Sequence, residues 1–312
     1  MEIGTDIVGD DRVIPDLFHK EVLGKNGRPR VRILILLGGA QAGLVSAERV
    51  HACAVHGIPA DHFDVKFAIS VGTYIALAYD ALQTALLRPM FLNFVTGGWW
   101  GMDPIQNLVD DIKQRLDQDT FYRCASEMFF GVSDSSGKFS WLGAKDSPNL
   151  FDLLYAASAF PPFSTGRTVD GIVAWDGALS HPCPVRVALQ KVIRKWEPGT
   201  EFDLLLVANR PRPHRLPPYD PIMYLSMIQG ILRWFVPPPL RIGAMEIDRK
   251  IADTIPLFWK ERKFFRLTAW FASEDEYISP LDWNPWVLER KADIVQRSTH
   301  TVLKRYRPEP WV

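Results

Sequence analysis

The stretch VRILILLGGAQAG, from Val31 to Gly43, decides the fold of this chain. Its first seven residues are an apolar, largely branched run, which is typical of a strand buried on both faces of a parallel sheet. Glycines follow at once, and residues 44–58 then have a helical pattern that ends at Gly57. This order of strand, glycine turn and helix predicts the first unit of an α/β sheet.

A second unit of the same kind follows in KFAISVGTYIALAY, residues 66–79. The run Phe67–Ile69 suits a buried strand, Ser70 and Gly72 mark a sharp turn, and the apolar residues after them suit a buried helix. Further strands are expected within residues 127–144, as a hairpin, and within 171–179, 201–209 and 264–271. We therefore expect a three-layer α/β/α fold with a mostly parallel central sheet.

The chain divides by composition into three parts. Residues 1–30 have an irregular, polar pattern and are expected to form an N-terminal extension. Residues 31–210 carry the strand and helix patterns of the core, and the proline-rich RPRPHRLPPYDP marks its end. Residues 211–312 are expected to form a C-terminal helical region that packs on the core.

Composition excludes several classes of protein. The 36 basic and 36 acidic residues balance, which argues against a nucleic-acid partner. Three cysteines without a C-x-x-C pair predict neither a disulfide framework nor a metal site. We expect a cytoplasmic protein, because a reducing compartment fits the cysteines and neither a signal peptide nor a membrane span is visible. No pattern in the sequence predicts a particular oligomeric state.

The glycine loop GGAQAG can serve chemistry as well as folding. Gly38 and Gly39 let the backbone turn tightly after the strand and approach a ligand closely. The N–H groups of the following helix can then bind a phosphate or a developing oxyanion; a tight turn without a ligand is the alternative. Ala40 breaks the dinucleotide fingerprint and no G-K-[ST] follows, so we expect no nucleotide cofactor.

Ser70 and Asp176 are the candidate reactive side chains. Ser70 stands where a buried strand turns into a buried helix, which exposes its hydroxyl at the carboxyl edge of the sheet. A serine that caps the helix is the alternative. Asp176 ends an apolar strand and precedes Gly177, in a pattern that an ordinary Asp-Gly turn also has.

Three motifs in this order resemble those of the patatin-like phospholipase family: GGAQAG at 38–43, AISVG at 68–72 and DGA at 176–178. Small residues and a proline before the Asp-Gly turn are also similar. The resemblance covers residues 31–210 and implies a patatin-like core that hydrolyses lipid acyl esters without metal or cofactor.

The resemblance also implies roles for single residues. Ser70 would be the nucleophile and Asp176 its base, in a dyad without histidine. The backbone N–H groups of Gly38, Gly39 and Ala40 would bind the oxyanion, and the small residues Ala68, Gly72 and Gly177 would let the turns close.

Two departures from the family pattern leave alternatives open. Ala68 replaces the first glycine of the elbow, and Ala42 stands where the family has a basic residue. A catalytically impaired homologue that binds lipid or membrane is therefore one alternative. Another is an α/β-hydrolase esterase with the triad Ser70, Asp176 and His300, which has that fold's chain order.

The segment PIMYLSMIQGILRWFVPPPL, residues 221–240, suggests peripheral contact with a membrane. This segment is expected to be a core helix or a lid over an acyl pocket, and the alternative is a helix in a bilayer interface. His181, close to Asp176 in the sequence, is a candidate lining residue or an ordinary helix-start residue.

Overall fold

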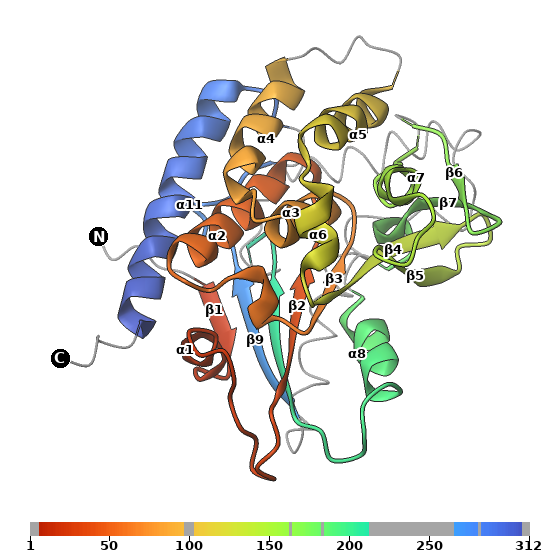
Figure 1. Ribbon diagram of the computed structural model, residues 1–312. Helices are drawn as coiled ribbons and strands as arrows, with labels where there is room; N and C mark the ends of the chain where they lie inside the picture. The colour runs from red at the N-terminus through yellow and green to blue at the C-terminus, as the bar shows by residue number, and fades with distance from the viewer. Residues whose placement is uncertain are drawn as a thin grey trace.

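The computed structural model describes residues 6–96, 103–161, 164–181, 184–211, 265–279 and 282–307. Over these residues the chain forms an α/β fold in which helices flank one sheet of nine strands (Figure 1). The predicted fold class is confirmed. Residues 221–240, with the helix expected there, lie outside the described residues.

The sheet has a parallel centre and antiparallel edges. Along the sheet the strands follow the order β1-β9-β8-β2-β3-β4-β7-β6, and β5 pairs with β4. Their bounds are Asp6–Gly9 (β1), Val31–Leu36 (β2), Val65–Ala68 (β3), Glu127–Asp134 (β4), Phe139–Gly143 (β5), Arg167–Val169 (β6), Ile172–Asp176 (β7), Phe202–Val207 (β8) and Phe265–Phe271 (β9). Strands β9, β8, β2, β3 and β4 are parallel to one another, as helix-connected strands are.

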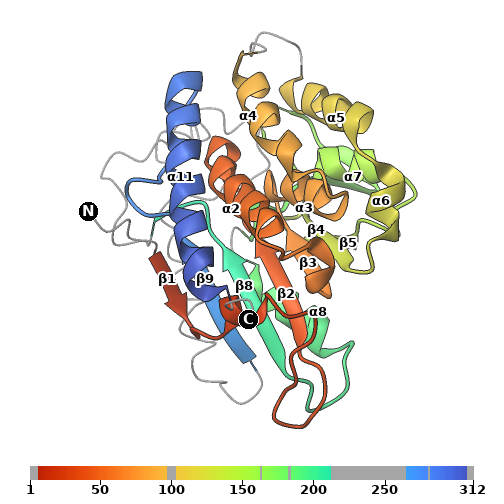
Figure 2. The ribbon, with the colours of Figure 1, turned by 60° about the vertical axis from the view of Figure 1, so that its left-hand side comes forward.

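Helices cover both faces of the sheet (Figure 2). Their bounds are Val13–Asp16 (α1), Gly43–Val55 (α2), Gly72–Asp80 (α3), Leu87–Thr96 (α4), Pro104–Arg115 (α5), Gln118–Arg123 (α6), Leu150–Ala156 (α7), Val185–Ile193 (α8) and Pro285–Tyr306 (α11). Helices α2, α3, α4 and α11 pack on one face and α8 packs on the other. The side chains of β2 alternate between these two layers, and all six of its residues are buried.

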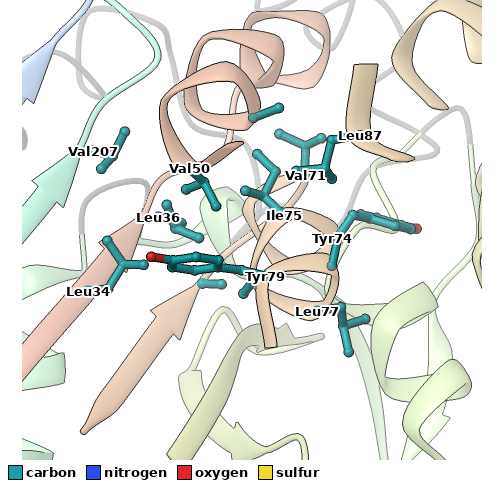
Figure 3. Packing of buried hydrophobic residues seen from close by; sticks show 14 of the residues in the cluster. Leu34, Leu36, Val50, Val71, Tyr74, Ile75, Leu77, Tyr79, Leu87 and Val207 are labelled. Atoms are coloured by element: carbon teal, nitrogen blue, oxygen red, sulfur yellow. The ribbon is translucent and has the colours of Figure 1, made fainter. Parts of the chain in front are cut away.

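The larger core holds the start of α3 firmly in place. Leu36 of β2, Val50 of α2 and Ile75 of α3 lie in one buried cluster, shown in Figure 3. Val71, the residue after Ser70, belongs to the same cluster. The turn that carries Ser70 is therefore fixed by packing on its helix side.

Helix α11 lies along α2 in the same direction. Arg88 of α4 contacts Glu48, in the middle of α2, and Asp293, in the first half of α11. At the end of α2, His56 contacts His300. Because α2 begins at the carboxyl edge of the parallel strands, the first turn of α11 points to that edge as well.

Residues 6–30 contain more regular structure than the sequence pattern predicts. Residues Asp6–Gly9 form β1, which pairs antiparallel with the edge strand β9. Ile7 packs against one core layer and Val8 against the other. A strand of four residues is too short for its alternation to be read reliably, which is why the sequence pattern did not predict β1.

Candidate active site

The candidate residues gather at the carboxyl edge of the parallel strands. Gly38 follows β2, and Ser70 follows the neighbouring strand β3. Asp176 ends β7 and pairs with Val132 of β4, two residues beyond the position that pairs with Ala68. The register therefore brings the end of β7 level with Ser70, at the edge where α/β sheets place their sites.

Ser70 occupies a strained turn. Its φ of 53° lies in the left-handed region, which is uncommon for a residue with a side chain. The carbonyl of Ser70 accepts two hydrogen bonds from Thr73: one from its backbone N–H at 3.0 Å and one from the Thr73 hydroxyl at 2.6 Å. Such an outlier at a strand-to-helix turn is typical of a nucleophile elbow.

Gly72 is required by the packing of this turn. A Cβ on Gly72 would lie 2.7 Å from the carbonyl oxygen of Leu36 in β2. The absence of a side chain therefore lets α3 begin directly against the neighbouring strand. Ala68 fits within β3, where its methyl group is fully buried in the larger core.

The glycine loop lies directly against Ser70. A Cβ on Gly38 would come within 2.6 Å of the Ser70 Cβ. Gly39 has φ 147° and Ala40 has φ 48°, so the backbone turns sharply before α2. Among the described residues, no acceptor takes the N–H groups of Gly38, Gly39 or Ala40. These three groups are thus available to a ligand beside Ser70.

Ala42 is fully buried below the loop. A side chain added to Gly39 would touch the Ala42 methyl group at 3.4 Å. The position at which the resemblance leads one to expect a basic residue is therefore occupied by a small apolar one that faces the interior.

Asp176 is the buried carboxyl of the site, with an exposed fraction of 1%. One carboxyl oxygen accepts the N–H of Ala178 at 2.8 Å, and the Ser70 side chain lies close enough to lower the pKa of the carboxyl. Burial raises the pKa of Asp176 to about 7, although the nearby Ser70 side chain and the N–H of Ala178 act to lower it. The structure thus pairs the two side chains that the sequence singled out.

Gly177 allows the turn after Asp176 to form. A Cβ on Gly177 would lie 2.6 Å from the carbonyl oxygen of Gly131 in β4. On the same turn, His181 donates its N–H to the carbonyl of Gly177 at 2.9 Å, and its ring lies 4.9 Å from that of Phe139.

A short segment after α7, Ala157–Ala159, holds the backbone of both candidate residues. The Ala157 carbonyl accepts the N–H of Ser70 at 3.1 Å, and the Ala159 carbonyl accepts the N–H of Asp176 at 3.0 Å. Between them, the hydroxyl of Ser158 lies 2.9 Å from that of Tyr74 in α3. Sequence reasoning gave this segment no role, and its only signal was a run of small residues.

Asn209 is a second residue that sequence reasoning missed. It follows β8, next to β2 in the sheet, and its side chain bonds to the glycine loop. The available signal was a polar residue at the end of a strongly apolar strand.

The structure does not bring His300 to Ser70 and Asp176. His300 lies on α11, where its Nδ1 is 2.6 Å from the Nε2 of His56. His56 caps the end of α2, whereas Ser70 lies at the edge where α2 begins.

The described part of the chain shows neither a metal-binding cluster nor a membrane-spanning helix. Within it, no three or more His, Cys, Asp or Glu side chains gather as a metal would need. None of its helices is long and apolar enough to span a bilayer.

The solved structures that are similar to this chain include two of low identity. No family model matches the chain, and no curated protein does. VipD from Legionella pneumophila has a TM-score of 0.41 and 9% identity, covering 92% of this chain and 70% of its own. ExoU from the type III secretion system of Pseudomonas aeruginosa, in complex with SpcU, has a TM-score of 0.31 and 12% identity, covering 97% and 66%. Identities this low do not indicate a shared activity.

Proposed function

We propose that this chain is a serine acyl hydrolase that cleaves lipid acyl esters with Ser70 as nucleophile and Asp176 as base. The observation that carries the proposal is the buried Asp176 carboxyl, which the strand register brings level with Ser70 and on whose pKa the Ser70 side chain acts. A strained serine turn and an unpartnered row of N–H groups beside it give further support. The lipid substrate class comes from the motif resemblance to patatin-like phospholipases.

Asp176 has the protonation behaviour that a general base needs. An ordinary carboxylate, with a pKa near 4, is too weak a base for a serine hydroxyl. Burial raises the pKa of Asp176 to about 7, close to a typical working pH. A base whose pKa matches the working pH transfers protons most effectively, so the dry surroundings of Asp176 serve the reaction.

The reaction then runs in two halves. Ser70 Oγ attacks the ester carbonyl carbon while Asp176 takes the hydroxyl proton, and the tetrahedral intermediate collapses as the leaving alcohol takes that proton. In the second half, Asp176 takes a proton from water, whose oxygen attacks the acyl-serine. The fatty acid leaves and Ser70 regains its proton.

The glycine loop stabilises the negative oxygen of both intermediates. The N–H groups of Gly38, Gly39 and Ala40 have no acceptor among the described residues, and Gly38 touches Ser70. Fixed donors of this kind act where charge develops, and losing one typically lowers kcat by about 100- to 1000-fold.

Fatty-acid release from mixed phospholipid vesicles tests the proposal. We expect the wild type and His300→Ala to release fatty acid at similar rates, and Ser70→Ala and Asp176→Asn to release none. An active Asp176→Asn together with an inactive His300→Ala would instead support the α/β-hydrolase triad. Melting temperatures of all four proteins show that each is folded.

A catalytically impaired, lipid-binding homologue is the second candidate, because buried Ala42 leaves the loop without its basic residue. Flotation with vesicles separates the two functions. A wild type that floats with lipid but releases no fatty acid, at any pH from 6 to about 9, would favour the binding role.

Peripheral contact with a membrane would bring the site to its substrate. Trp286, in the first turn of α11, is 79% exposed, and that turn points to the edge of the sheet that holds the site. Tryptophan favours the interface between water and lipid. We expect Trp286→Ser to weaken flotation with vesicles while hydrolysis of a soluble short-chain ester stays unchanged; an unchanged flotation would remove Trp286 from this role.

A further inference from the structure

Asn209 joins the glycine loop to α2 through both polar atoms of its side chain. Its Nδ2 donates to the carbonyl of Leu37 at 2.8 Å and to that of Gly38 at 3.1 Å. Its Oδ1 accepts the N–H of Ser46 in α2 at 3.1 Å, and also the Ser46 hydroxyl. The side chain is buried, with an exposed fraction of 1%.

These bonds orient the N–H groups of the loop. A peptide is planar and trans, so its N–H points away from the side to which its carbonyl points. Because Asn209 draws the carbonyls of Leu37 and Gly38 to one side, the N–H groups of Gly38 and Gly39 both face the other side. Successive N–H groups that face one way form a concave anion site.

The position of the loop agrees with this geometry. A Cβ on Gly38 would point at Ser70, whereas a Cβ on Gly39 would lie 3.5 Å from the Asn209 Cβ. The loop therefore lies between the nucleophile and Asn209. Among the described residues, no other donor bonds to the carbonyls of Leu37 and Gly38, so Asn209 alone fixes these two peptides there.

We propose that Asn209 is the positioning residue of the oxyanion site: it holds the N–H groups of Gly38 and Gly39 toward the acyl oxygen without touching substrate. This inference rests on the proposed hydrolase function. It predicts a loss in the stabilisation of the tetrahedral intermediate and little change in the binding of the ground-state ester.

Asn209→Ala, compared with the wild type, tests the proposal in the full chain. We expect kcat to fall about 100-fold, with KM within about threefold of the wild type. Affinity for a trifluoromethyl ketone, which forms a tetrahedral oxyanion on serine, should fall in parallel with kcat. Affinity for the matching non-hydrolysable ether should stay unchanged. Thr268→Ala removes a buried hydroxyl from the neighbouring strand β9 and serves as the control, with wild-type kcat expected.

Ser46→Ala provides a second variant should Asn209→Ala fail to fold. Because Ser46 holds the Asn209 amide, we expect a smaller loss in kcat, about tenfold, again without a change in KM. In the double variant, Ser46→Ala should add no further loss, since both changes act through one amide.

A failure of the role of Asn209 and a failure of the hydrolase function give different results in these measurements. An active wild type whose kcat and ketone affinity survive Asn209→Ala or Ser46→Ala would overturn the role of Asn209 and leave the hydrolase intact. Equal losses in ketone and ether affinity would assign Asn209 to general folding. A wild type that neither hydrolyses ester nor binds the ketone would overturn both the hydrolase and the inference.

Discussion

Gly38 and Ser70 are in contact across two neighbouring strands: a Cβ on Gly38 would lie 2.6 Å from the Ser70 Cβ and 3.2 Å from its Oγ. The contact joins the two motifs of the candidate site, because the group that would hold the oxyanion and the group that would attack come from adjacent turns.

Gly38→Ala should therefore abolish most of the activity. The added methyl group displaces either the Ser70 side chain or the loop, and we expect kcat to fall by about 100-fold or more. Gly199→Ala is the control, since that glycine has positive φ and open space around it. The control should lose a little stability and keep its kcat; a Gly38→Ala enzyme with normal kcat would contradict the contact.

The pH dependence of the rate reports on Asp176. Only the ionised carboxyl can take the proton of Ser70, and burial raises its pKa to about 7. We expect kcat/KM to rise with pH and to reach half its maximum near pH 7 in the free enzyme. An activity that is already maximal at pH 5 would show that an ordinary carboxylate, or no carboxylate at all, is the base.

Asp176 should also destabilise the folded protein at neutral and alkaline pH. Its folded-state pKa is raised above the usual 3.8, so protonation favours the folded state. The stability that the protonated carboxyl gives the folded state is fully present below about pH 4 and is lost as pH rises through 7. We expect Asp176→Asn to raise the melting temperature at pH 8 and to change it little at pH 4. A Tm gain that is the same at both pH values would mean that the carboxyl is not buried.

The main features of fold and site could be predicted because they depend on local patterns. The apolar run of β2 and the turn at Ser70 predict two strand–turn–helix units, and Asp176 lies at the end of another strand. Asn209 and the Ala157–Ala159 segment could not be assigned roles, because their hydrogen bonds join residues far apart in the sequence. Strand β1 was missed for a similar reason, since it pairs with β9, which is far away in the sequence.

The contact between His56 and His300 predicts acid sensitivity in the docking of α11. Burial is the main cause that lowers the pKa of both rings from 6.5, and neighbouring positive charges lower it further. The charged groups around the two rings are His51, Glu48, Lys304 and Arg307. A lowered folded-state pKa means that stability is fully present above pH 6.5 and is lost as pH falls below it.

Melting temperatures of the wild type and His300→Gln across this range measure the effect. We expect the wild type to lose more Tm between pH 7.5 and pH 5 than the variant, which carries one titrating ring fewer. Parallel curves for the two proteins would show that the histidine pair does not sense pH.

The central claim is that Ser70 is a nucleophile activated by Asp176. Intact-mass measurement after treatment with a fluorophosphonate, followed by peptide mapping, tests it most directly. We predict a single phosphonyl adduct on Ser70 in the wild type, a greatly slowed reaction in Asp176→Asn and none in Ser70→Ala. An unlabelled wild type that is folded, or a wild-type rate in Asp176→Asn, would contradict the account.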